Sequence, residues 1–195
     1  MKKIQASIMA CLLLLLAGCG TPVVPDKVTD NSISISGQGE VVSYLVDDFD
    51  KDYYNVEDLR TMATDEATAY NLRTSTGSVT VEKVEKQDAK VLLVQRFVNA
   101  SVYTDYNQEK MFFGTVSEAV SEGYDLSGGV KDVKGQTAIL EEQIRENSNA
   151  RLIITDAKAV IYPPAEVRGI SAGVYNENGT VNTSGAEGTV IILLK

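Results

Sequence analysis

Between residues 55 and 72, apolar side chains recur every three or four positions, which is the spacing of an amphipathic helix. Asn55 stands at the position of a helix N-cap, and Asp58 follows three residues later. The segment Ser75–Gly77 is rich in residues that interrupt helices. The pattern therefore predicts a long helix that begins after Asn55 and ends near Leu72.

Short apolar or alternating runs predict strands over much of the remaining chain. We expect an interrupted strand over residues 33–46, broken near Gly37 and Gly39, and an antiparallel hairpin from residues 78–84 and 89–98. Further strands are expected over residues 110–113, 151–155, 158–162, 167–175, from 180 onward, and 189–194. The last of these is apolar at almost every position, which favours a strand covered on both faces.

Two shorter helices and a helical turn are also indicated. Residues 101–107 fit a short helical turn, and Thr115 with Glu118 forms a capping-box pattern that opens a helix ending near Gly123. A helix over residues 137–147 would turn its apolar positions inward; these are Ile139, Leu140 and Ile144. Strands and helices do not strictly alternate, so the fold class predicted is α+β. We expect a single domain over residues 32–195, with a mainly antiparallel sheet and two or three helices.

The first residues show a different pattern. Lys2 and Lys3 precede an apolar run from Ile8 to Gly18, which is shorter than the roughly 20 residues needed to span a bilayer. A basic start followed by a short apolar segment is typical of a secretory signal. The run ends in Leu16, Ala17, Gly18 and Cys19, which resembles the bacterial lipobox. The alternative is an apolar N-terminal helix that ends at an incidental cysteine.

The lipobox resemblance implies that residues 1–18 are a signal peptide and that Cys19 carries a diacylglyceryl group. Two acyl chains give stable membrane anchoring, at about 0.8 kcal/mol per buried CH₂. Residues 19–31 contain Pro22 and Pro25 and no apolar periodicity, so we expect a flexible tether there. The expected location is the outer face of a bacterial cell membrane.

Composition excludes several functions. The chain carries 27 acidic and 18 basic residues, and a strongly acidic domain is repelled by nucleic acid. There is no histidine, and both cysteines, Cys11 and Cys19, belong to the proposed signal and anchor. Catalytic triads that use histidine, thiol nucleophiles and ordinary zinc sites are therefore excluded from the mature domain. Neither a cofactor nor catalysis is expected.

One acidic stretch precedes the long helix. Asp48, Asp50 and Asp52 alternate like the first ligands of an EF-hand, but Tyr53 replaces the glycine of that loop and Leu59 replaces its glutamate. A weak calcium site of another geometry is one interpretation. The simpler one is that these carboxylates precede the helix N-terminus, where the helix dipole stabilises negative charge.

Tyrosines provide a second candidate surface. Tyr53 and Tyr54, or Tyr103 with Tyr106, could present an aromatic ligand surface. The alternative is that these residues lie at the edge of the core with their hydroxyls in water.

Three stretches are similar to a group of small lipoproteins of Gram-positive gut bacteria without an assigned function. These are DDFDKDYYNVEDL (47–59), MFFGTVSEA (111–119) and VIYPPAEVRGIS (160–171). The resemblance implies packing and capping roles for these residues, and it supplies no catalytic residue.

The function expected is a membrane-anchored, non-catalytic module that binds an envelope protein, a glycan or a small ligand. A hydrolase acting on cell-wall glycan is the alternative, and Glu40, Glu57, Glu118 and Glu166 are its available carboxylates. A ligand-delivery subunit of a transporter is a further alternative, although the chain is short for two lobes.

Overall fold

The computed structural model describes residue 25 and residues 28–195. The proposed signal peptide, the lipobox (Leu16–Gly18) and Cys19 lie outside these residues. Within them the chain forms four helices: α1 (Val56–Arg73), α2 (Ala100–Asn107), α3 (Val116–Ser121) and α4 (Glu141–Glu146).

Twelve strands in the described residues form two sheets. The seven-stranded sheet has the order β10-β11-β8-β1-β2-β4-β3 and consists of β1 (Ser32–Ile35), β2 (Val41–Asp48), β3 (Val79–Gln87), β4 (Lys90–Phe97), β8 (Val160–Tyr162), β10 (Val174–Tyr175) and β11 (Val181–Asn182). The five-stranded sheet has the order β5-β7-β12-β9-β6 and consists of β5 (Met111–Thr115), β6 (Lys131–Asp132), β7 (Arg151–Thr155), β9 (Val167–Ile170) and β12 (Val190–Leu194). Strands β1 and β8 are parallel, and the other pairs are antiparallel. The α+β class and the antiparallel pairing are confirmed, and the strands divide between two sheets.

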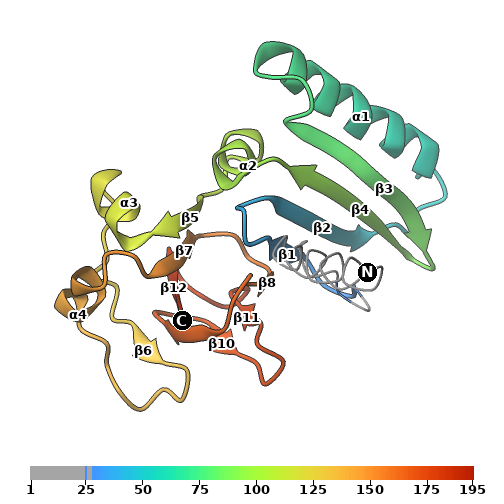
Figure 1. Cartoon of the computed structure of the whole chain (residues 1–195). Coiled ribbons are helices and arrows are strands. Elements are labelled where there is room, and N and C mark those ends of the chain that lie inside the picture. The colour runs from blue at the N-terminus through green and yellow to red at the C-terminus, as the bar shows by residue number, and fades with distance from the viewer. Residues whose placement is uncertain (1–24, 26–27) are drawn as a thin grey trace, which may run out of the picture.

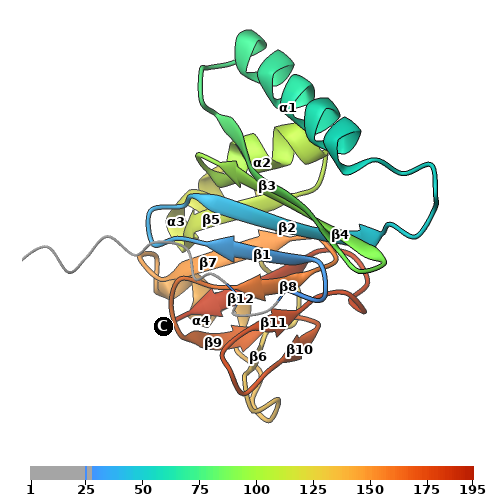
Figure 2. The same cartoon turned by 90° about the vertical axis from the view of Figure 1, so that its right-hand side faces the viewer.

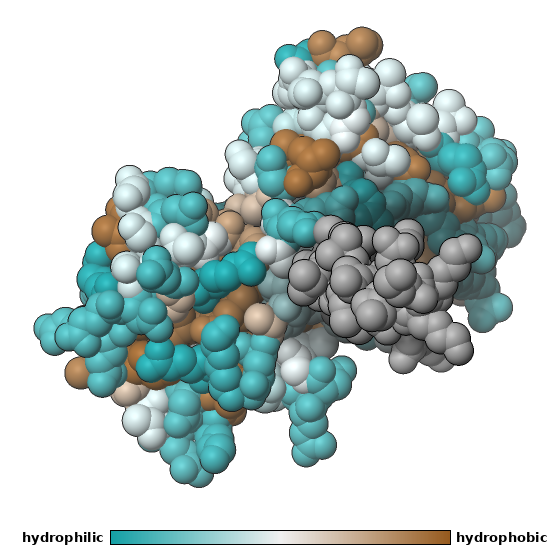
Figure 3. All heavy atoms as spheres, viewed as in Figure 1, coloured by the Kyte–Doolittle hydropathy of each residue, from teal (hydrophilic) through white to brown (hydrophobic). Residues whose placement is uncertain are grey.

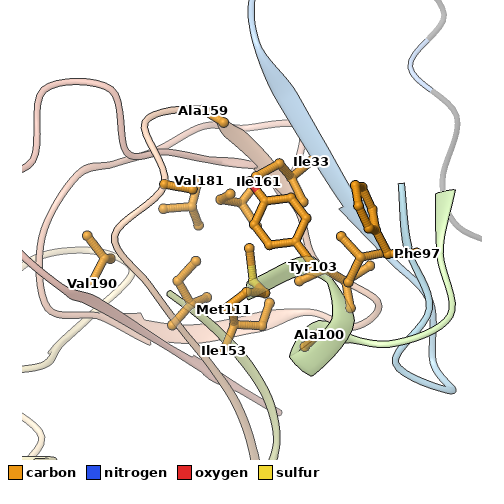
Figure 4. Close-up of a cluster of buried hydrophobic side chains, with 14 of the residues drawn as sticks. Ile33, Phe97, Ala100, Tyr103, Met111, Ile153, Ala159, Ile161, Val181 and Val190 are labelled. Carbon is orange, nitrogen blue, oxygen red and sulfur yellow. The ribbon is translucent and has the colours of Figure 1, made fainter. Parts of the chain in front are cut away.

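The two sheets share one hydrophobic core. Ile33 and Ile161 of the seven-stranded sheet and Ile153 and Ile192 of the five-stranded sheet belong to the same buried cluster, together with Tyr103 of α2. Figure 4 shows the Tyr103 ring in the middle of this cluster. Figures 1 and 2 show the strands of one sheet lying over those of the other, with α1 at the β3–β4 end.

Strand β12 lies between β7 and β9 and is buried along its whole length, as its continuous apolar run predicts. Ile192 faces the shared core, whereas Ile191 and Leu193 face a second cluster on the opposite side of the five-stranded sheet. That cluster is closed by Val116 of α3 and Ile144 of α4. The five-stranded sheet is therefore covered on both faces.

Helix α1 follows the predicted range closely. The Oδ1 atom of Asn55 accepts hydrogen bonds from the backbone N–H groups of Glu57 and Asp58 at 2.8 and 3.4 Å. Ala63 and Ala67 are the buried small residues that bring the helix close to the sheet. The predicted N-cap and the predicted end near Leu72 are confirmed.

Two sequence predictions about helix α4 are wrong in detail. The helix expected over residues 137–147 begins only at Glu141, because Ile139 donates its N–H to Val130 and is buried in a strand-like pairing. Leu140 was expected to face inward, yet it precedes the helix as its N-cap and is 58% exposed.

The strand expected over residues 167–175 is divided at Gly173, where φ is +86°. Strand β9, before this glycine, pairs with β12 in the five-stranded sheet. Strand β10, after it, pairs with β11 in the seven-stranded sheet. The glycine therefore allows the chain to pass from one sheet to the other.

The side chain of Asn71 in α1 is hydrogen-bonded to the backbone of the edge strand β3, and its removal is expected to destabilise the domain. Its side chain donates to the carbonyl oxygen of Val79 at 2.8 Å and accepts from the N–H of Val79 at 2.9 Å. We expect Asn71→Ala to cost about 1–3 kcal/mol of unfolding free energy, because both backbone groups lose a partner. Urea unfolding measures the loss, and the exposed neighbour change Leu72→Ala is the control. Equal stability of the two variants would contradict the role given to Asn71.

Candidate functional site

The aromatic pair predicted from sequence lies in the loop between β2 and α1. Tyr54 contacts the buried Phe49 with ring centroids 5.0 Å apart, and Tyr53 packs edge-on against Tyr54 at 4.9 Å. Tyr53 is 78% exposed, so it forms the outer end of this stack. The structure thus brings Tyr53 and Tyr54 together on the surface.

The aspartates Asp48, at the end of β2, and Asp50 and Asp52, in the loop, do not converge. Asp50 forms an ion pair with Lys51 at 3.1 Å, and the N–H of Asp48 donates to the side chain of Asp47. Asp52 is exposed. Among residues 28–195, no three acidic side chains are grouped so that they could hold a metal ion. The geometry therefore gives no support to a calcium site at Asp48, Asp50 and Asp52.

The other tyrosine pair belongs to the core. Tyr103 is 2% exposed and its hydroxyl donates to Glu109 at 2.6 Å. Burial, followed by the Glu109 carboxylate, raises the pKa of Tyr103 far above its ordinary value. Tyr106 packs against Phe97 and Tyr70, with centroid distances of 5.5 and 5.3 Å. Tyr103 is therefore a core residue and does not present a ligand surface, whereas Tyr106 is half-buried and lines a second hollow together with Tyr70 of α1.

A hollow that the sequence does not point to lies where α2, α3, β5 and the turn between β1 and β2 meet. We call it the α2–α3 pocket. It has a volume of about 430 Å³, within the range common for small-molecule sites, and its wall includes Gly37, Gly39, Asn99, Phe113, Tyr124 and Arg151. Figure 3 shows a notch on this face, between the lobe that carries α3 and α4 and the lobe that carries α1.

Arg151 is the cation of the α2–α3 pocket. It is the first residue of β7, opposite Thr115 of β5, and its side chain is half-buried. The guanidinium carbon lies 4.2 Å from the centroid of the Phe113 ring, and Nη2 donates to the carbonyl oxygen of Gly37 at 2.6 Å. These contacts hold a flat, charged group in a fixed orientation at the wall of the pocket.

The turn between β1 and β2 places the carbonyl oxygen of Gly37 within hydrogen-bond distance of Arg151. Ser36 Oγ accepts from the N–H groups of Gln38 and Glu40 at 3.3 and 3.0 Å, and Gly39 has a φ of +89°. A Cβ atom at Gly39 would lie 3.4 Å from the Phe113 ring. The sequence pattern around Gly37 and Gly39 therefore marks a tight hairpin turn, in which β2 pairs back onto β1.

Glu118 lies in the same wall and completes the predicted capping box. Its Oε2 atom accepts from the N–H of Thr115 at 2.7 Å and from the Thr115 hydroxyl at 2.9 Å, and its own N–H donates to that hydroxyl oxygen at 3.2 Å. These hydrogen bonds, with a smaller contribution from the charge of Arg151, hold the pKa of Glu118 below its ordinary value. Glu118 is therefore ionised near neutral pH and serves as a cap.

The lowered pKa of Glu118 makes its contribution to stability depend on pH. The contribution is complete above the ordinary glutamate pKa of about 4.3 and is lost as the pH falls through the lower pKa of the folded protein. We expect Glu118→Gln to melt at a lower temperature than the unchanged protein at pH 7, and this difference to shrink between pH 4.5 and pH 3. Melting curves across this range test it, with Glu122→Gln as the control one turn further along the pocket wall. A difference that stays constant with pH would contradict it.

No family model, curated protein or solved structure matches this chain. None of the helices in the part of the chain that the structure describes is long and apolar enough to cross a bilayer.

Sequence reasoning missed the α2–α3 pocket because its wall comes from segments far apart in the chain. Part of the signal was present: the stretch 111–119 was singled out, and the structure places Phe113 and Glu118 from it in the wall. Arg151 carried no signal, because it appears in the sequence only as the first residue of an ordinary strand.

Proposed function

We propose that this chain is a lipid-anchored extracytoplasmic lipoprotein whose single α+β domain binds a ligand without catalysing a reaction. The lipobox pattern at Leu16–Cys19 supports the anchor and the location on the outer face of a bacterial membrane. The α2–α3 pocket supports the binding role, and it is the observation that carries this half of the proposal.

The pocket has the features of a ligand-binding site rather than those of a site for proton transfer. Its lining includes the whole of β5, which pairs with β7 over five residues, together with Arg151 of β7 and the start of α2. Its capping carboxylate, Glu118, has a lowered pKa, whereas a general acid in glycoside hydrolysis needs a raised one. Rigid walls and an ionised carboxylate suit a binding site.

The alternative of a glycan hydrolase requires two facing carboxylates. Its four candidates are engaged with different partners: Glu40 with Arg96, Glu57 with Arg60, Glu118 with Thr115, and Glu166 with Lys195. This arrangement favours the binding role over the hydrolase.

A thermal-shift screen of the full chain in a nonionic detergent tests the proposed function. The panel consists of calcium, glycan fragments, peptides and small organic acids, amines and alcohols. A ligand that binds only the folded state raises the melting temperature with increasing concentration, so we expect one class to do so. A flat response to every class, or hydrolysis of a glycan fragment that is lost in Glu118→Gln, would contradict a ligand-binding, non-catalytic domain.

A further inference from the structure

We propose that the α2–α3 pocket binds a small organic carboxylate that carries an apolar group, with Arg151 as the residue that receives the carboxylate. This inference rests on the proposed binding function and names the class of ligand for it.

The charge of Arg151 is only partly balanced by the protein. Within residues 28–195, no carboxylate oxygen lies within 4.0 Å of its guanidinium in an ion pair. The charge of Arg151 lowers the pKa of Glu118, but the Oε2 atom of Glu118 already accepts hydrogen bonds from the N–H and the hydroxyl of Thr115. Arg96, by comparison, contacts both Glu40 and Glu82 at 2.8 and 2.5 Å. Glu118 and Glu122 also line the pocket, but neither forms an ion pair with Arg151. A half-buried arginine without such a partner favours an external anion at this point of the wall.

The geometry of Arg151 selects a planar anion. A guanidinium has five N–H donors, and the hydrogen bond from Nη2 to Gly37 uses one of them. Stacking on Phe113 fixes the plane of the group, so the remaining donors keep a set direction. A carboxylate matches this arrangement, because its two oxygens accept parallel hydrogen bonds from an arginine.

The helix α2 adds to the attraction for an anion. Asn99 Oδ1 accepts from the N–H of Val102 at 2.9 Å and caps the helix. Ala100 and Ser101, the first two residues of α2, line the pocket. The positive end of the helix dipole therefore faces the same hollow as Arg151 and supplements its charge.

The apolar part of the ligand would contact aromatic rings. Phe113 and Tyr124 are both half-buried and line the pocket, and Tyr124 packs against Phe112 with ring centroids 4.8 Å apart. Rings that are held by neighbours and partly open to the pocket favour an apolar group at little entropic cost. The volume of about 430 Å³ suits a molecule of modest size, such as an acylated amino acid.

Two acids and their neutral amides provide the test: N-acetyl-L-phenylalanine with N-acetyl-L-phenylalaninamide, and hexanoate with hexanamide. Each is added at increasing concentration to the full chain in nonionic detergent, and the rise in melting temperature gives its affinity. We expect the acids to bind at least tenfold more tightly than their amides. Because each acid and its amide differ only at the carboxylate, this comparison needs no variant.

Substitution of the arginine locates the site. Arg151→Gln should abolish the preference for the acids, and Arg151→Lys should restore only part of it, because lysine keeps the charge but not the planar donors. Arg168→Gln, on strand β9, removes an equal charge outside the pocket and should leave the preference unchanged.

Three results would overturn the inference. They are equal binding of both acids and their amides, failure of both acids to bind, and an acid preference that persists in Arg151→Gln. If another class in the wider screen raises the melting temperature while both acids fail, the carboxylate inference alone is wrong. If no class raises the melting temperature, the proposed binding function is wrong as well.

Discussion

Phe97→Ala is expected to lower the unfolding free energy by about 3–5 kcal/mol, the usual cost of removing a buried aromatic ring. Phe97 is fully buried at the end of β4 and lies in the core that the two sheets share. Its ring contacts Tyr103 and Tyr106 of α2, with centroids 5.2 and 5.5 Å apart. Tyr106 in turn contacts Tyr70 of α1, so the loss of Phe97 removes the support of both helices.

Urea unfolding measures this effect. Val98→Ala is the matched control, because Val98 is the next residue and is 49% exposed, so its loss should change little. Phe97→Leu keeps an apolar side chain in the core and should fall between the two. A Phe97→Ala variant as stable as Val98→Ala would show that the ring contacts do not connect α2 to the sheet.

Gly173→Ala is expected to cost about 2–4 kcal/mol, from two separate causes. The first is backbone strain, since φ is +86° and alanine disfavours this region. The second is a collision, because a Cβ atom would lie 2.6 Å from the carbonyl oxygen of Asn182. That oxygen belongs to the backbone of β11, so it can move only by disturbing the β10–β11 pair.

Gly179→Ala separates the two causes. Gly179 has a φ of +87°, almost the same as that of Gly173, but nothing lies within 4 Å of its Cβ position. It should therefore show the strain alone, and Gly173→Ala should be the less stable variant in urea unfolding. Equal losses would mean that the close approach to Asn182 adds nothing.

The sequence predicted elements whose signals are local. The cap at Asn55, the capping box of Thr115 and Glu118, and the continuous apolar run of β12 each depend on neighbouring residues, and each is found where expected. The helix expected from residue 137 was shortened by a contact with Val130, which helical periodicity does not reveal. Local patterns therefore established the elements but not all of their limits.

The arrangement of the sheets and the pocket depends on contacts between distant residues. Arg151 reaches Gly37 across 114 positions of the chain, and no local pattern signals this pairing. Gly173 likewise was not recognised as the point at which the chain changes sheets. Tyr53 and Tyr54, expected either as an aromatic ligand surface or as residues at the edge of the core, are both exposed.

The proposed function depends first on Cys19, because the binding domain can act at the membrane surface only if this residue carries the anchor. The most direct test is the intact mass of the chain, expressed with its own N-terminal segment in a Gram-positive bacterium and purified from the membrane fraction. We predict a protein that begins at Cys19 and carries a diacylglyceryl group, and a Cys19→Ala variant that keeps residues 1–18 and gains no lipid. A chain recovered without lipid, or one that begins at another residue, would contradict the proposal.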